Sequence, residues 1–148
     1  MSARILLLAA AGALVFAAAA ADAAPRKPAP AGFTVSGRAA GGLVPGGSLS
    51  IDLRLRNGRP FALRVTALTV AVRAASHPGC TPRANFATRP YRGRPVVVPA
   101  KAMRTLSGLR ISRRLWPRVV MRDTAGRQDT CAGARLSLRF TGAAGRAR

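Results

Sequence analysis

The sequence predicts an all-β domain of about seven short strands held by one disulfide. Several runs alternate apolar and polar residues with the period of two that turns one face of a strand toward a core. Glycine and proline, which favour turns, separate these runs, and the chain contains two cysteines. No stretch of the predicted domain repeats its apolar residues at helical spacing for long enough to predict a helix.

The clearest strand is predicted at residues 48–56. Its odd-numbered residues are Leu or Ile and its even-numbered residues are Ser, Asp or Arg, so one face is apolar and the other is polar. Pro and Gly at 45–47 and the Asn-Gly-Arg-Pro stretch at 57–60 are turn signals that bound the strand. We therefore expect a half-buried strand here.

The next run, residues 61–72, changes phase in its middle. Phe61, Leu63 and Val65 are odd-numbered, whereas the apolar residues that follow are even-numbered (Leu68, Val70, Val72). An extra residue near 66–67, in the form of a β-bulge or a change of sheet, would restore one continuous apolar face.

Five further strands are predicted, at residues 33–38, 95–99, 103–111, 118–122 and 134–141. Short strands of this number, separated by turns, are typical of an immunoglobulin-like sandwich, which we place at residues 33–143. A small β-barrel is the alternative, because the number of strands alone does not separate the two architectures.

The N-terminus has the pattern of an export signal. A basic start at Arg4 precedes an apolar, alanine-rich run, and Ala21-Asp22-Ala23 matches a signal peptidase site. We predict a signal peptide at residues 1–23, cleavage after Ala23 and a secreted or extracytoplasmic protein. A retained membrane helix is the alternative, since the apolar run of about 17 residues approaches the length of a membrane span. A flexible Pro/Ala-rich leader should follow at 24–32, and a basic tail at 144–148.

Cys80 and Cys131 are expected to form the disulfide, because paired cysteines in an exported chain are most simply joined. Both lie in loop-like surroundings, so the bridge should tie a long loop to the start of the last strand. It would enclose about 50 residues, worth on the order of 4 kcal/mol in the chain-entropy model. A metal site would need more ligands than His77 and a few Asp supply.

Charge is the strongest indication of a partner. The chain holds 25 Lys and Arg against four Asp and no Glu, a net charge of +21, and signal cleavage would remove Arg4 and Asp22 without changing it. A GC-rich genome favours arginine without any function, but the absence of Glu also indicates selection for a cationic surface. Such a surface attracts nucleic acid, anionic lipid, wall polymers or acidic proteins.

The strand phases predict which arginines face solvent. The candidate anion contacts are Arg54, Arg56, Arg64, Arg135 and Arg139, which would share a basic sheet face if their strands are neighbours. Two further groups are Arg113, Arg114, Arg118 and Arg122, and the loop residues Arg89, Arg92 and Arg94. The alternative is a diffuse, solvated charge that binds only weakly. Aromatic residues are too few to predict selective reading of a nucleic acid sequence.

The sequence lacks the parts of an enzyme. A pair of catalytic carboxylates would have to come from Asp52, Asp123 and Asp129, and a nucleophilic triad from His77 beside Pro78. We predict no catalytic residue, metal or cofactor. The partner is expected to be an unknown protein or an anionic component of the cell envelope, with non-specific polyanion binding as a second possibility.

Two motifs have both a structural and a binding interpretation. Residues 128–131, Gln-Asp-Thr-Cys, either contact a ligand or cap backbone groups beside the disulfide, and the second is favoured. Trp116, the one tryptophan, is either a stacking platform for sugars or a core residue, and the core is favoured.

The order of several motifs resembles a group of small secreted bacterial immunoglobulin-like proteins of uncharacterised function, of the type found in high-GC Gram-positive bacteria. The matching segments are residues 33–37, 43–46, the alternating strand that ends at Asn57, and residues 61–72, 98–99, 116–117, 123–124, 128–131, 133–134 and 140–142, together with Cys80, Tyr91 and Met121. Arg127 and Phe140 depart from the expected Asn and Tyr. The resemblance implies a fold and supplies no catalytic residues.

Overall fold

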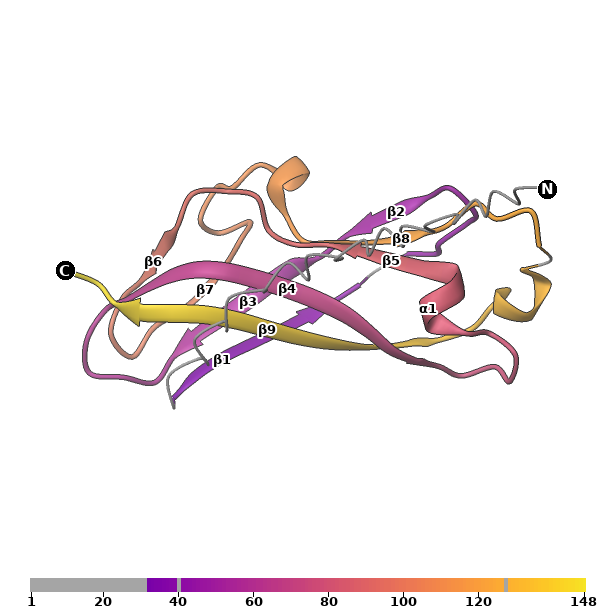
Figure 1. The fold of residues 1–148 in the computed structure, drawn as a ribbon. Coiled ribbons are helices and arrows are strands. Elements are labelled where there is room, and N and C mark those ends of the chain that lie inside the picture. The colour runs from indigo at the N-terminus through magenta and orange to yellow at the C-terminus, as the bar shows by residue number, and fades with distance from the viewer. Residues whose placement is uncertain (1–31, 40, 127) are drawn as a thin grey trace, which may run out of the picture.

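The computed structural model describes residues 32–39, 41–126 and 128–148. The predicted signal peptide, residues 24–31 of the leader and Arg127 lie outside the described residues. The described part forms nine strands in three small antiparallel sheets (Figure 1). The all-β prediction is confirmed, with two more strands than expected. The alternative of a barrel is wrong, because these sheets do not close on one another.

Each sheet contains three strands. The first has the order β1-β3-β7, with β1 at Phe33–Arg38, β3 at Asp52–Asn57 and β7 at Met103–Thr105. The second has the order β2-β8-β5, with β2 at Ser48–Ser50, β8 at Arg118–Met121 and β5 at Phe86–Arg89. The third has the order β6-β4-β9, with β6 at Val96–Val98, β4 at Leu63–Ala75 and β9 at Leu136–Arg146.

The predicted strand at 48–56 is divided between two sheets. β2 pairs with β8, whereas β3 pairs with β1 and β7, and Ile51 stands between them with its backbone N–H donating to the Pro117 carbonyl at 2.9 Å. The chain stays extended through this change, so the apolar alternation continues unbroken. A change of hydrogen-bonding partner therefore left no sign in the side-chain pattern.

β4 confirms the bulge expected from the change of phase. Its pairing with β9 shifts register between Val65 and Ala67, and Val65 and Leu68 are both buried as a result. The pairing runs from Leu63 opposite Arg146 to Ala75 opposite Leu136. β9 thus includes residues 144–146, which were expected in the basic tail.

Two segments differ from the sequence-based assignment. The strand predicted at 103–111 is too long, because after Thr105 the chain turns, with the Leu109 N–H donating to the Thr105 carbonyl at 3.0 Å and Arg110 at a φ of +54°. A short helix α1 (Pro82–Asn85) and the strand β5 that follows were not predicted. β5 carries one buried apolar residue, Phe86, and so shows no alternation to detect.

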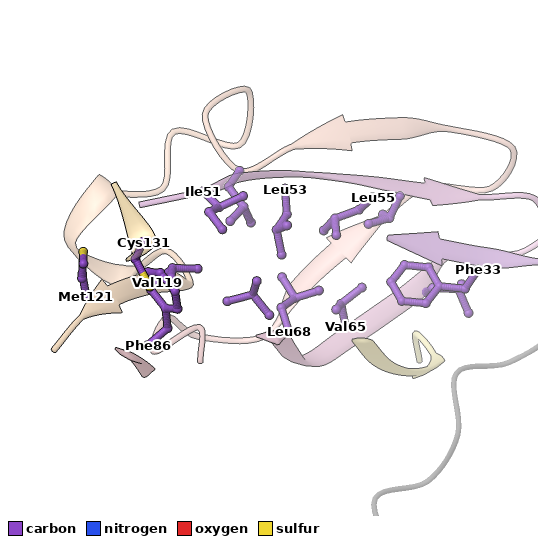
Figure 2. Packing of buried hydrophobic residues seen from close by; sticks show 14 of the residues in the cluster. Phe33, Ile51, Leu53, Leu55, Val65, Leu68, Phe86, Val119, Met121 and Cys131 are labelled. Carbon is purple, nitrogen blue, oxygen red and sulfur yellow. The ribbon is translucent and has the colours of Figure 1, made fainter. Parts of the chain in front are cut away.

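The apolar faces of the β1-β3-β7 and β6-β4-β9 sheets meet across the core. Figure 2 shows Leu53 and Leu55 pointing from one side toward Leu68 and Val65 on the other. At Gly142 a Cβ atom would lie 2.9 Å from Val35 Cγ2, so the absence of a side chain lets β1 pack directly on β9. Among the described residues, no helix is long and apolar enough to cross a membrane.

The predicted disulfide is present between Cys80 and Cys131, which are 51 residues apart and both buried. Cys80 lies between β4 and α1, and Cys131 ends the 3-10 helix η2 (Asp129–Cys131) just before β9. The bridge therefore joins a loop to the approach of the last strand, as expected. A closed loop of this size stabilises the fold by about 4 kcal/mol in the chain-entropy model.

Asn57 at the end of β3 is a buried polar side chain, 1% exposed. Its Nδ2 donates to the carbonyls of Phe61 at 2.8 Å, Val98 at 3.1 Å and Pro99 at 2.9 Å, and its Oδ1 accepts from the Arg59 N–H at 2.9 Å. These bonds hold the turn after β3 against the end of β6. Every polar atom of the amide is satisfied, which is what its burial requires.

Replacement of Asn57 by Ala is expected to lower the free energy of unfolding by about 2–4 kcal/mol, because the backbone groups it satisfies stay buried without partners. Urea unfolding followed by circular dichroism measures the change. Asn85→Ala is the control. The Asn85 amide donates to the Thr81 carbonyl and accepts from Gln128 Nε2, but it is only partly buried, so the expected loss is at most about 1 kcal/mol. Equal losses in the two variants would contradict this role for Asn57.

Candidate anion-binding site

The five predicted anion contacts are all exposed, but they do not share one face. Arg54 and Arg56 lie on the outer face of β3, where their cross-strand neighbours are neutral: Ser36 and Thr105 for Arg54, and Thr34 and Met103 for Arg56. β3 belongs to one of the two sheets whose apolar faces meet in the core. Its outward residues therefore face away from those of β4 and β9.

The other three predicted contacts lie with the opposite sheet. Arg64 on β4 stands opposite Val97 and Gly145, and Arg139 on β9 stands opposite Ala71. Arg64 and Ala71 are seven positions apart on β4, so roughly 20 Å of strand separates these two arginines. Arg135 precedes β9, where its N–H donates to Ser76 Oγ at 2.9 Å. A single basic face made of the five is not formed.

Arginines from other segments converge instead. A hollow of about 340 Å³ lies over the β2-β8-β5 sheet, and four arginines line it: Arg89, Arg92, Arg114 and Arg118. We call it the arginine hollow. Gly46, Ser48, Pro90, Trp116 and Val120 complete its lining. Among the described residues, Arg94, Arg113 and Arg122 do not line it, although the sequence grouped them with these four.

Two of the four arginines are placed by strand pairing. Arg89 on β5 stands directly opposite Arg118 on β8, so the two side chains leave the sheet on the same face. Val120 follows Arg118 by two residues on β8 and therefore lies on the same face, and it is paired with Ser48 on β2. The inward residues of β8, Val119 and Met121, are buried. Burial of that side therefore directs Arg118 outward.

The other two arginines are placed by tethered loops. The Arg92 N–H donates to the Leu115 carbonyl at 2.9 Å, and the preceding Tyr91 N–H donates to the Leu68 carbonyl at 3.0 Å. Arg118 Nη2 donates to the Arg114 carbonyl at 2.6 Å, which joins β8 to the 3-10 helix η1 (Arg113–Leu115). The backbone around the hollow is thus fixed by hydrogen bonds on both sides.

Tyr91 shapes the loop that carries Arg92. Its hydroxyl donates to the Arg94 carbonyl at 2.9 Å, and a Cβ at Gly93 would collide with that hydroxyl, so only glycine fits beneath the ring. Partial burial raises the pKa of Tyr91 above its ordinary value through desolvation. The phenol therefore stays neutral and keeps its proton for this bond.

Trp116 combines the two interpretations left open by the sequence. It is half-buried against the core, and its indole Nε1 donates to the Ile111 carbonyl at 3.0 Å. It also forms part of the wall of the arginine hollow. The residue is thus anchored by the fold and still contributes aromatic surface to the site.

The acidic side chains of the described residues lie elsewhere. Among the described residues that line the hollow, none is Asp or Glu. Asp52 accepts hydrogen bonds from the backbone N–H and the hydroxyl of Ser107, and Asp123 and Asp129 line a separate hollow near the disulfide. The four arginines therefore line one hollow without a carboxylate in the lining to neutralise them.

The motif at residues 128–131 makes structural contacts. Gln128 Nε2 donates to Asn85 Oδ1 and to the Arg122 carbonyl, each at 3.0 Å, and Thr130 Oγ1 donates to the Gly79 carbonyl at 3.4 Å. These bonds join the segment before β9 to the segment that contains Cys80. They agree with the favoured interpretation that the motif caps backbone groups beside the disulfide.

No group of three or more His, Cys, Asp or Glu side chains in the described part of the chain is placed to hold a metal ion, and His77 is exposed. Comparisons with protein-family models, with curated proteins and with solved structures found no match. The arginine hollow is the candidate site because it brings four arginines together with no Asp or Glu in its described lining.

The pairing of Arg89 with Arg118 yields a prediction about stability. Like charges directly opposite each other in a sheet are destabilising, so Arg89→Gln should raise the free energy of unfolding by about 0.2–1 kcal/mol at low ionic strength. Denaturant unfolding at low and high salt measures this, and the gain should shrink in high salt because the repulsion is screened.

Arg54→Gln is the matched control for this prediction. It removes the same charge from an exposed strand position whose cross-strand neighbours are neutral, so no comparable gain is expected. A gain of the same size in both variants would mean that net charge, rather than the pairing of Arg89 with Arg118, sets the repulsion.

Proposed function

We propose that this protein is a secreted, non-enzymatic module with an immunoglobulin-like sandwich fold that makes contacts with proteins or the cell envelope, aided by the electrostatic attraction of its basic surface. The facing apolar sheets and the inter-loop disulfide support the fold and an extracytoplasmic location. The signal-peptide pattern at residues 1–23 supports export. The resemblance to small secreted bacterial proteins agrees with both.

The observation that carries the proposal is the placement of the arginines. The structure exposes them on both outward sheet faces and gathers four more around one hollow. Such a surface draws anionic partners from several directions and raises their association rates. The arginines thus supply the attraction that contact with an anionic surface requires, without any catalytic group.

A second candidate, a polyanion-binding cationic protein, is favoured by the arginine hollow. It differs from the first in the expected effect of salt. As the salt concentration rises, binding by charge alone is lost, because ions screen the charges and counterion release becomes less favourable. A complementary protein interface with a buried apolar centre persists at high salt. The two candidates are therefore separated by one titration.

The test is retention of the oxidised protein on heparin, duplex DNA and anionic vesicles as a function of salt. We expect binding at low salt, with a slope of log affinity against log salt that reports several neutralised charges. Loss of binding at moderate salt would favour the polyanion binder. A partner from the envelope retained at high salt would favour the specific module. No retention at low salt would exclude the electrostatic attraction that both candidates invoke, and would leave only a protein partner bound without it.

Export has its own test. Intact-mass and N-terminal analysis of the protein secreted by an expressing bacterium should give a mature chain that begins at Ala24, because signal peptidase cleaves after the small residue at Ala23. Substitution of Ala21 and Ala23 by bulky residues should block processing. An uncleaved chain recovered from the membrane fraction would instead support a retained anchor.

A further inference from the structure

We propose that the arginine hollow is a binding site for the phosphate group of an organic phosphomonoester. This inference rests on the proposed function, because it names the chemistry of the anionic group that the surface recognises. It assigns recognition to one place on the molecule, whereas the dispersed arginines supply only general attraction.

The first argument is uncompensated charge. Arg89, Arg92, Arg114 and Arg118 line about 340 Å³ of space, and the described lining contains no carboxylate. Guanidinium groups remain charged at all physiological pH values. A ligand with a single charge would leave most of this positive charge unbalanced, so the hollow favours a group with two negative charges.

The second argument is the fixed geometry. Arg89 and Arg118 leave neighbouring strands at paired positions, so their side chains lie side by side on one face. Arg118 is further held by its bond to the Arg114 carbonyl, and the backbone of Arg92 is held by the Leu115 carbonyl. The guanidinium of Arg118 and the backbone that carries Arg92 are therefore ordered before a ligand arrives, which lowers the entropy lost on binding.

The third argument is chemical fit. The planar fork of arginine matches the oxygens of phosphate and can bond two of them at once. A phosphomonoester carries about −1.5 to −2 charges at pH 7 and presents three terminal acceptor oxygens to several donors. A sulfate ester or a phosphodiester carries one charge and is a weaker match for four guanidinium groups.

The fourth argument concerns the organic part of the ligand. Trp116, Pro90 and Val120 line the same hollow, so apolar surface stands beside the arginines. This surface can pack against the group that carries the phosphate, whereas inorganic phosphate would leave it uncovered. We therefore expect an organic phosphate to bind more tightly than the free ion.

The test uses calorimetric titration of the intact, oxidised protein with phenyl phosphate, phenyl sulfate and inorganic phosphate. At pH 7.5 phenyl phosphate should bind about ten-fold more tightly than phenyl sulfate, because only the former is a dianion. Its affinity should fall about five-fold at pH 5, since the second pKa of a phosphomonoester is near 6 and the monoanion that then predominates should bind about as weakly as phenyl sulfate. Phenyl sulfate should show no such fall.

The pH effect belongs to the ligand. The charged groups among the described residues that line the hollow are the four arginines, and guanidinium groups stay charged at every physiological pH. A decrease in the affinity of phenyl sulfate over the same range would show that the protein titrates, and it would overturn the assignment to a phosphate dianion.

The variant is Arg89→Gln with Arg92→Gln, which removes two exposed charges from the hollow. The matched control is Arg73→Gln with Arg83→Gln, which removes two exposed charges outside it. The hollow variant should lose at least about ten-fold in affinity for phenyl phosphate, since each removed charge-assisted bond is a strong one. The control should stay within about three-fold, and circular dichroism checks that both variants fold.

The outcomes separate this inference from the proposed function. Equal losses in the two double variants, or no binding of phenyl phosphate by a protein that heparin retains, would overturn the phosphate site and leave general attraction standing. A protein retained by no anionic matrix at low salt would instead overturn the electrostatic attraction that the proposed function invokes. Selective loss in the hollow variant supports the site.

Discussion

The alternation of β3 is the constraint on which the rest of the molecule depends. Leu53 and Leu55 are completely buried, and Arg54 and Arg56 between and beyond them are exposed. A strand cannot bury one set without turning the other outward, because its side chains alternate strictly between faces. Since the polar positions of this chain are so often arginine, the same pattern that builds the core also makes the surface basic.

A surface of this charge repels itself, and the fold must offset that repulsion. The chain has few aromatics with which to enlarge its core, which consists mainly of Leu and Val with Ile51, Phe33 and Phe86. The disulfide restricts the unfolded chain, and the buried amide of Asn57 satisfies four backbone groups where two sheets meet. The disulfide and the Asn57 hydrogen bonds therefore stabilise the domain. Salt bridges can contribute little, because the chain has so few acidic residues to pair with its arginines.

The sequence predicted the features that depend on the order of residues along one segment. It missed the features that depend on which strands are hydrogen-bonded to each other. Apolar periodicity predicted the strand at 33–38 and the bulge beside Val65, and the presence of two cysteines predicted the Cys80–Cys131 bridge. The change of sheet at Ile51 and the strand β5 were not predicted, because the side-chain pattern contains no record of which strands are hydrogen-bonded. For the same reason the five arginines chosen from strand phase proved exposed but scattered. The arginine hollow needed the pairing of β5 with β8 and the folding of two loops to bring its residues together.

The two groups of arginines differ in a way that composition does not explain. A genome that favours arginine places it wherever a polar residue is tolerated, and Arg54, Arg64 and Arg139 fit this account because their cross-strand neighbours are neutral. Arg89 and Arg118 face each other directly, an arrangement that costs stability. Structures keep such costs mainly at sites of function, where the strain is offset when a ligand binds. The paired arginines Arg89 and Arg118, whose repulsion opposes folding, therefore indicate a functional site better than the dispersed arginines do.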